Sequence, residues 1–169
     1  ITGLHGSGKN ELAFSLEKQL FDLDATAVLL DGKAMRMGLS RELDYSPADR
    51  AENLRRVAHV CKTLNDQGIM TICSFVSPSE KVREQVAEII GKERFIMIYI
   101  DSDLEYCRKN DNYGLYDKAD AGEINNIPGI DMDFDIPTNP DLKLDPRKND
   151  QNIQKIIQFI SQRKFFPLD

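Results

Sequence analysis

A glycine-rich loop at the start of the chain constrains the fold more than any other feature of the sequence. Residues 3–9 read GLHGSGK, which matches the pattern G-x-x-x-x-G-K of a phosphate-binding loop. Gly3, Gly6 and Gly8 let the backbone curl so that successive N–H groups point at one anion. The dipole of a following helix adds to the attraction, and Lys9 is expected to reach the β- and γ-phosphates of a nucleotide. The loop therefore predicts a phosphate site between a strand and a helix.

The position after Lys9 departs from this pattern. It ordinarily holds Ser or Thr, whose hydroxyl binds Mg²⁺, and here it is Asn10. An amide oxygen can bind a hard cation, but the longer side chain with its two donors would disturb octahedral geometry. The alternative is that Asn10 is a tolerated substitution. The predicted phosphate- and ATP-binding set is Gly3, Gly6, Ser7, Gly8, Lys9 and Asn10, with Asn10 as the candidate metal ligand.

Only Ile1 and Thr2 precede this loop, although a phosphate-binding loop normally follows several apolar strand residues. We therefore expect the chain to be either truncated or a domain of a longer protein, and we favour the second.

Strand and helix patterns alternate along the chain, which predicts a parallel sheet with helices on both faces. Apolar periodicity and capping residues predict helices over 11–23, 47–67, 77–91 and 149–163. Short apolar runs predict strands over 27–30, 69–76 and 95–100. Together these features predict one α/β domain over residues 1–169, with a three-layer P-loop fold.

The stretch from Asp111 to Pro140 differs from the rest. It holds three glycines, three prolines and many acids, and it has no sustained periodicity. A loop of this length in a compact domain is typically a functional lid or disordered. We therefore expect a lid over residues 111–140.

Composition excludes several classes of partner. The formal net charge of −6 argues against nucleic acid and against anionic membrane surfaces. No apolar run approaches membrane-spanning length. The three cysteines, Cys61, Cys73 and Cys107, are widely spaced in apolar segments, which is typical of reduced thiols in a cytoplasmic protein. For the two histidines, His5 and His59, we expect no catalytic role.

Several further segments, in order, resemble the adenylylsulfate kinase family. Residues 30–39 read LDGKAMRMGL, similar to L-D-G-D-N-x-R-x-G-L, and residues 46–56 read SPADRAENLRR, similar to S-x-x-D-R-x-E-N-x-R-R. Residues 74–78 read SFVSP, similar to S-F-I-S-P. Residues 114–116, 121–124 and 129–131 follow a lid pattern G-L-Y-K-K-A-R-A-G-E-I-K-N-F-T-G-I-D. The resemblance runs from residue 1 to about residue 140.

The resemblance implies phosphoryl transfer from ATP with Mg²⁺ to the 3′-hydroxyl of adenosine 5′-phosphosulfate (APS), giving ADP and PAPS. It implies Asp31 and Lys9 as catalytic residues. It also implies a set of residues that bind APS or PAPS: Lys33, Arg36, Arg50, Asn53, Phe75, Ser77 and Lys118. The family often forms dimers, which implies a homo-oligomer.

Several positions depart from the family on the side that transfers the phosphoryl group. The second acid of D-G-D-N is Lys33, a cation that would repel magnesium. In the lid, family cations are replaced by Asn110, Tyr113, Asp117, Asp120 and Asn125, and Lys118 remains. Cations around a migrating phosphoryl group are worth orders of magnitude in rate. These departures predict impaired transfer.

Three functional hypotheses stay open at this point. The first is a working adenylylsulfate kinase with unusual metal and lid residues. The second is a non-catalytic regulatory module that binds PAPS or APS and is fused to an ATP sulfurylase, in which Lys33 would pair with the 3′-phosphate of PAPS. The third, a different P-loop kinase of small metabolites, explains the loop but leaves Arg36, Arg50, Asn53 and Phe75 unexplained.

Overall fold

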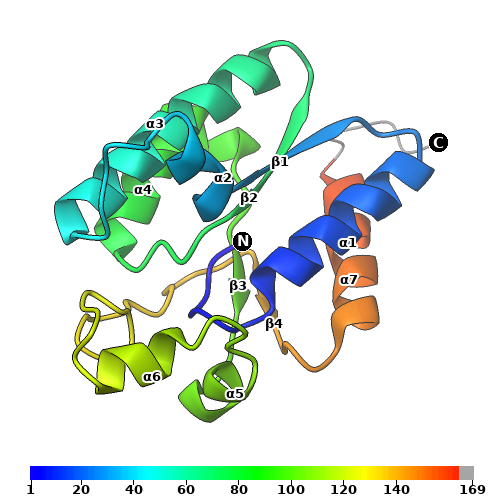
Figure 1. Cartoon of the computed structure of the whole chain (residues 1–169). Coiled ribbons are helices and arrows are strands. Elements are labelled where there is room, and N and C mark those ends of the chain that lie inside the picture. Colours follow the sequence, from blue (N-terminus) through cyan, green and yellow to red (C-terminus); the bar gives the residue numbers. More distant parts are fainter. Residues whose placement is uncertain (164–169) are drawn as a thin grey trace.

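The computed structural model describes residues 1–163 as alternating helices and parallel strands (Figure 1). The helices are α1 (Lys9–Asp22), α2 (Gly32–Met37), α3 (Pro47–Asp66), α4 (Glu80–Ile90), α5 (Leu104–Lys109), α6 (Leu115–Asp120) and α7 (Asn149–Gln162), with a 3₁₀ turn η1 (Lys92–Arg94). The strands are β1 (Ala27–Asp31), β2 (Met70–Ser74), β3 (Ile98–Ile100) and β4 (Leu142–Leu144). The order of the main predicted elements is confirmed.

The four strands form two parallel pairs with the first residues of the chain between them. β1 pairs with β2, and β3 pairs with β4. The Ile1 carbonyl accepts from the Phe75 N–H at 3.2 Å, and the Thr2 N–H donates to the Ile98 carbonyl at 2.8 Å. Residues 1–2 therefore connect β2 to β3, and the phosphate-binding loop starts at the carboxyl edge of both pairs, where α/β proteins place their ligands.

Two layers of helix cover the two faces of the strands (Figure 1). α1 and α7 pack on one face, where Leu12, Leu16 and Leu20 recur at helical spacing and are almost fully buried beside Ile98 and Ile156. α3 and α4 pack on the other face in a second apolar cluster. The predicted three-layer α/β fold is confirmed.

Helix α3 begins where its capping residues predict. The Ser46 hydroxyl accepts from the Asp49 N–H at 3.2 Å, and Pro47 occupies the first helical position. This cap fixes the direction of α3 and so the side chains that it presents to the site.

The helix predicted over 77–91 is wrong at its start. α4 begins at Glu80 with Ser79 at its N-cap, because Ser77 has a φ of 39° outside the helical region. The Ser77 hydroxyl donates to Thr2 Oγ1 at 2.7 Å, and its carbonyl accepts from Arg83 at 2.6 Å. These contacts hold residues 77–79 as a connection rather than a first helical turn.

The strand predicted over 95–100 is shorter, with its ladder limited to Ile98–Ile100. Of the residues predicted to begin it, Phe95 is the C-cap of η1, and the Met97 N–H donates to the Asp141 carboxylate at 2.8 Å.

The segment predicted as a lid over residues 111–140 contains α6. Tyr116 of α6 is buried with Cys107 and Ile127 in a third apolar cluster. The lid is therefore packed on its own small core, which lies beside α5 at the lower part of Figure 1.

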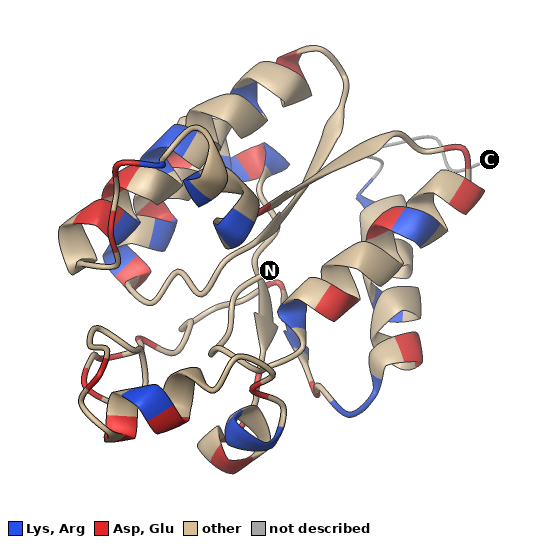
Figure 2. Ribbon diagram, in the orientation of Figure 1, with Lys and Arg blue, Asp and Glu red and all other residues tan. Residues whose placement is uncertain are grey.

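The three cysteines are free, as expected. Cys61 and Cys73, although widely spaced in sequence, bring their Sγ atoms to 3.3 Å. Among the helices of residues 1–163, none has both the length and the apolar character needed to cross a membrane. Figure 2 shows basic and acidic segments intermixed over the helices rather than gathered by sign.

Candidate functional site

The phosphate-binding loop has the backbone that its glycines predict. Gly6 and Gly8 have φ values of 75° and 84°, in the left-handed region that favours glycine. A Cβ on Gly6 would lie 2.2 Å from the Cys107 carbonyl oxygen, so the loop is pressed against α5. Gly8 then caps α1, which directs the positive end of the helix dipole toward the loop.

Lys9 and Ser7 are buried inside this loop. The Lys9 ammonium donates to the Leu4 carbonyl at 2.8 Å, and burial lowers the pKa of Lys9 to about 8. The buried Ser7 hydroxyl has no hydrogen-bond partner among residues 1–163. A desolvated ammonium beside an unpaired hydroxyl is stabilised when an anion enters the loop, which supports the predicted phosphate-binding residues.

Asn10 and Asp31 meet through Ser74. The Ser74 hydroxyl donates to the Asn10 amide oxygen at 2.6 Å, and Ser74 is the register partner of Asp31 across the β1–β2 ladder. Asp31 Oδ1 accepts from the N–H groups of Lys33 and Ala34 at 2.7 and 2.8 Å, which caps α2. The predicted catalytic carboxylate is thus fixed at the carboxyl end of β1, two contacts from the phosphate loop.

The residues at this edge fit a magnesium ion that arrives with a nucleotide. Within residues 1–163 no group of three or more His, Cys, Asp and Glu could hold a metal by itself. Mg²⁺ normally takes only one or two protein ligands and completes its shell with phosphate oxygens and water. Asn10 is exposed, and its amide oxygen, with one hydrogen bond from Ser74, keeps a second lone pair for a metal.

Two predicted arginines converge on one aromatic ring. The guanidinium groups of Arg36 and Arg50 lie 4.5 and 5.1 Å from the centre of the Tyr45 ring. Arg50 also donates to the carbonyls of Tyr45 and Asn126 at 2.9 and 2.8 Å, so it connects α3 to the lid. Burial, followed by the charge of Arg36, lowers the pKa of Arg50. Two adjacent guanidinium groups of this kind form a site for an anion such as phosphate or sulfate.

Asn53 lies on the same helix and has an unusual environment. It is 1% exposed, yet its Oδ1 has no hydrogen-bond partner within the described part of the chain, and the same is true of Arg36 Nε. Buried polar atoms are nearly always paired, so two orphan atoms at one site indicate a polar ligand or water.

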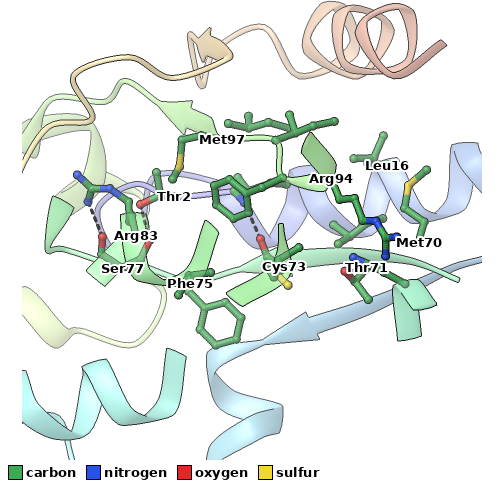
Figure 3. Close-up of a pocket in the computed structure, with 18 of the residues that line it drawn as sticks. Thr2, Leu16, Met70, Thr71, Cys73, Phe75, Ser77, Arg83, Arg94 and Met97 are labelled. Atoms are coloured by element: carbon green, nitrogen blue, oxygen red, sulfur yellow. Dashed lines mark hydrogen bonds between the residues drawn. The ribbon is translucent and has the colours of Figure 1, made fainter. Parts of the chain in front are cut away.

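Three other predicted APS-binding residues have environments that differ from those of Arg36 and Arg50 at the Tyr45 ring. Phe75 is 7% exposed and packs in the core between α3 and α4, with its ring next to Gly32. Ser77 is engaged by Thr2 and Arg83, and Lys118 is exposed on α6. Figure 3 shows Phe75 and Ser77 at the edge of an apolar cavity of about 350 Å³ between β2 and β3.

Lys33 lies at the start of α2 and faces the lid. Its side chain is exposed, and its ammonium lies 5.9 Å from the centre of the Tyr113 ring, itself 65% exposed. Tyr113 of the lid is therefore close to Lys33, the residue that stands where the family has an acid.

A second cavity, of about 1030 Å³, lies beside Leu4 at the carboxyl ends of β3 and β4. Its acidic residues are partly neutralised by ion pairs of Asp101 with Lys143 at 2.8 Å and of Asp103 with Arg147 at 3.0 Å. The cavity therefore borders the phosphate loop at Leu4.

Sequence reasoning missed the contact between His5 and Asp111. His5 Nε2 lies 3.3 Å from an Asp111 carboxylate oxygen, and the Tyr116 hydroxyl donates to the His5 carbonyl at 2.8 Å. The presence of a histidine inside the phosphate loop was the available signal, but its partners lie in the lid, far away in sequence.

Comparisons with known proteins agree with this geometry. A sequence profile described as adenylylsulphate kinase matches residues 1–145. An adenylyl-sulfate kinase of Oceanobacillus iheyensis is 39% identical over 167 residues, covering 98% of this chain and 84% of that relative. A bifunctional enzyme CysN/CysC of Rhodopirellula baltica is 46% identical over 145 residues, covering 86% of this chain but only 22% of that relative.

Among solved structures, the Mycobacterium tuberculosis APS kinase CysC in complex with AMPPNP and APS has a TM-score of 0.91 and 39% identity. The match covers 95% of this chain and 94% of that one.

Proposed function

Because the chain belongs to the adenylylsulfate kinase family, we propose that it binds ATP and APS and transfers a phosphoryl group between them. The products would be ADP and PAPS, with the terminal phosphoryl group of ATP moved to the 3′-hydroxyl of APS. The similar structure that contains both AMPPNP and APS supports two nucleotide sites in one such domain.

The placement of Asp31 beside the phosphate loop is the observation that carries this proposal. Lys9 and the loop glycines would hold the β- and γ-phosphates, and Asp31 lies across the β1–β2 ladder from Ser74, whose hydroxyl donates to Asn10. Because Asp31 caps α2 with one carboxylate oxygen, its other oxygen can orient a substrate hydroxyl and accept its proton. Arg36, Arg50 and Asn53 would hold the phosphosulfate and base of APS.

Asn10 is the residue of this chain that would hold the magnesium ion of the ATP complex. When bound, that ion would neutralise charge on the phosphates that are separated during transfer.

We further propose that transfer is slow. Lys33, where the family has an acid, lies two residues after the catalytic carboxylate, and its ammonium lies 5.9 Å from the centre of the Tyr113 ring at the start of the lid. The lid helix α6 presents Asp117 and Asp120 around its single Lys118 (Figure 2). Each preorganised donor that is missing around the migrating group costs about 10²–10³ in rate.

A magnesium-dependent assay of ADP and PAPS formation tests the proposal. We expect turnover only when ATP and APS are both present, and we expect Asp31→Asn to lower kcat by roughly a hundredfold or more with little change in either KM. The absence of measurable binding of both nucleotides would contradict it.

A regulatory module that binds PAPS is the second candidate, favoured by the exposed ammonium of Lys33. It predicts that PAPS binds more tightly than APS and that no transfer occurs. Calorimetric titrations with ATP, APS and PAPS separate the two candidates. A working kinase must bind ATP, whereas the regulatory module need not.

The bifunctional relative supports the proposal that a domain of this kind works beside a second enzyme, for which an ATP sulfurylase is the candidate. Co-purification of the full-length protein with ATP sulfurylase activity tests it, and a full-length protein without that activity or partner would contradict it.

A further inference from the structure

His5 is the side chain of the phosphate loop that contacts the lid. Its imidazole is 27% exposed, and its Nε2 lies 3.3 Å from the Asp111 carboxylate, which is only 3% exposed. A close contact between an imidazole and a buried carboxylate fixes the orientation of both groups.

The contact is reinforced by the backbone on both sides. Asp111 accepts from the N–H groups of Tyr113 and Tyr116 at 3.1 and 2.9 Å, and the Tyr116 hydroxyl donates to the His5 carbonyl at 2.8 Å. The first turn of the lid and the phosphate loop are therefore connected through His5 by its side chain and by its backbone.

The charges around His5 come from three elements. α1 contributes Lys9 and Glu11, the start of the lid contributes Asp111, and Lys33 of α2 lies across the Tyr113 ring. Burial and then the charge of Lys9 lower the pKa of His5, while Asp111 acts in the opposite direction. At neutral pH, His5 in the free chain is therefore held as the uncharged imidazole.

A polyphosphate in the loop would oppose the effects that lower the pKa of His5. The bound anion neutralises the Lys9 ammonium and adds negative charge close to His5, and both effects favour the imidazolium. An imidazolium next to Asp111 forms a charge-assisted hydrogen bond, which is roughly twice as strong as a neutral one.

We propose that His5 is a positioning residue that takes up a proton when a polyphosphate binds in the loop. The resulting pair with Asp111 then holds the first turn of the lid against the occupied site. This inference rests on the proposed function only in requiring that a nucleotide phosphate binds at residues 3–10.

Nuclear magnetic resonance tests the proposal directly, because the chain has only two histidines. His59 is exposed on α3 and serves as the internal control, and His59→Asn assigns the two imidazole signals. On addition of AMPPNP we expect the titration midpoint of His5 to rise by about one pH unit or more, a tenfold change in proton affinity. The His59 signal reports unspecific effects of the added nucleotide, and Asp111→Asn should remove most of the shift of His5.

Calorimetry adds a measurement that a merely structural role would not change. In buffers of different ionisation enthalpy, the binding of AMPPNP to the unmodified chain and to His59→Asn should take up a fraction of a proton. His5→Asn, which keeps a hydrogen-bond donor but does not titrate, should take up less.

Binding of AMPPNP without a change in the midpoint of His5 would overturn this inference alone. Absence of any AMPPNP binding would overturn both the proposed function and the inference. Should His5→Asn fail to fold, the titration of the unmodified chain still decides the matter.

Discussion

The Ser74 hydroxyl donates to the Asn10 amide oxygen at 2.6 Å and so joins β2 to the phosphate loop. Ser74 thereby orients the one side chain of the loop that is expected to bind magnesium, as an outer-shell partner of a metal ligand does. The strength of the metal site should therefore depend on both residues of this pair.

The first prediction concerns Asn10→Ser, which restores the small hydroxyl ligand of the ordinary loop. The hydroxyl allows a closer approach to an octahedral ion and adds no extra donors. We expect half-saturation by Mg²⁺ at a concentration roughly tenfold lower, measured on nucleotide binding or on PAPS formation. Ser74→Ala is the companion variant. It removes the hydrogen bond that orients Asn10, and it should raise the Mg²⁺ concentration needed for half-saturation. An unchanged magnesium requirement in both variants would contradict a role for Asn10.

Lys33→Asp should separate the two candidate functions. Removal of the cation two residues after Asp31 and restoration of the family acid should raise kcat for PAPS formation by about tenfold or more if the chain is a slow kinase. The same change should weaken PAPS binding if Lys33 pairs with the 3′-phosphate. Lys81→Asp, an exposed charge reversal on α4, is the control and should change neither quantity.

Arg50→Lys tests the APS side. Arg50 donates from separate nitrogens to Tyr45 and Asn126 while its plane lies over the Tyr45 ring, and a lysine ammonium cannot reproduce this arrangement. We expect the KM for APS to rise by about tenfold and the KM for ATP to stay nearly constant, because ATP binds at the other end of the site. Equal changes in both KM values would contradict a role of Arg50 that is confined to APS.

The pH dependence of the lid follows from two of its carboxylates. Hydrogen bonds from the Ile127 and Asn126 N–H groups lower the pKa of Asp131. Burial alone would raise the pKa of Asp111, but the N–H groups of Tyr116 and Tyr113 and the contact with His5 outweigh burial, so its pKa is lowered as well. A carboxyl with a lowered folded-state pKa contributes stability that is fully present above the unfolded value of about 3.9 and is lost as pH falls through the folded value.

The lid should therefore lose its order on acidification below about pH 4. Amide signals of Tyr116 and Ile127, followed from pH 6 to pH 3, should broaden or exchange before those of β3. Asp131→Asn should remove part of this pH dependence. Simultaneous loss of the lid and β3 signals would contradict a separate acid transition of the lid.

The sequence predicts the layered fold because its longest elements carry their own signals. The spacing of Leu12, Leu16 and Leu20 and the Ser46–Pro47 cap are local features that tertiary contacts did not override. Short elements lack such signals, and so α6, with six residues, and β4, with three, were not predicted. Ser77 looked like a helix cap, but its hydroxyl is taken by Thr2, a partner 75 residues away.

In the candidate site, too, some residues were predicted from the sequence and others were not. Arg36 and Arg50 were predicted from their resemblance to a family pattern, and the structure brings both to the Tyr45 ring. The His5 contacts could not be predicted, because Tyr116 lies 111 residues further along the chain. Only the packing of the lid on its own apolar cluster brings these residues together.

The last prediction concerns the close approach of the phosphate loop to α5. Gly6→Ala would place a Cβ 2.2 Å from the Cys107 carbonyl oxygen at a φ of 75°, so the loop or α5 must move. Gly68→Ala is a matched control, because its φ is 79° but no atom lies within 4 Å of the added Cβ. The control should cost about 1 kcal/mol of the free energy of unfolding, from backbone conformation alone.

We expect Gly6→Ala to cost at least about 1–2 kcal/mol more than the control, because backbone atoms cannot yield as a flexible side chain can. It should also abolish nucleotide binding, which Gly68→Ala should leave intact. Chemical denaturation and a titration with AMPPNP measure the two effects. Equal stability of the two variants would show that the contact between Gly6 and Cys107 does not hold the loop in place.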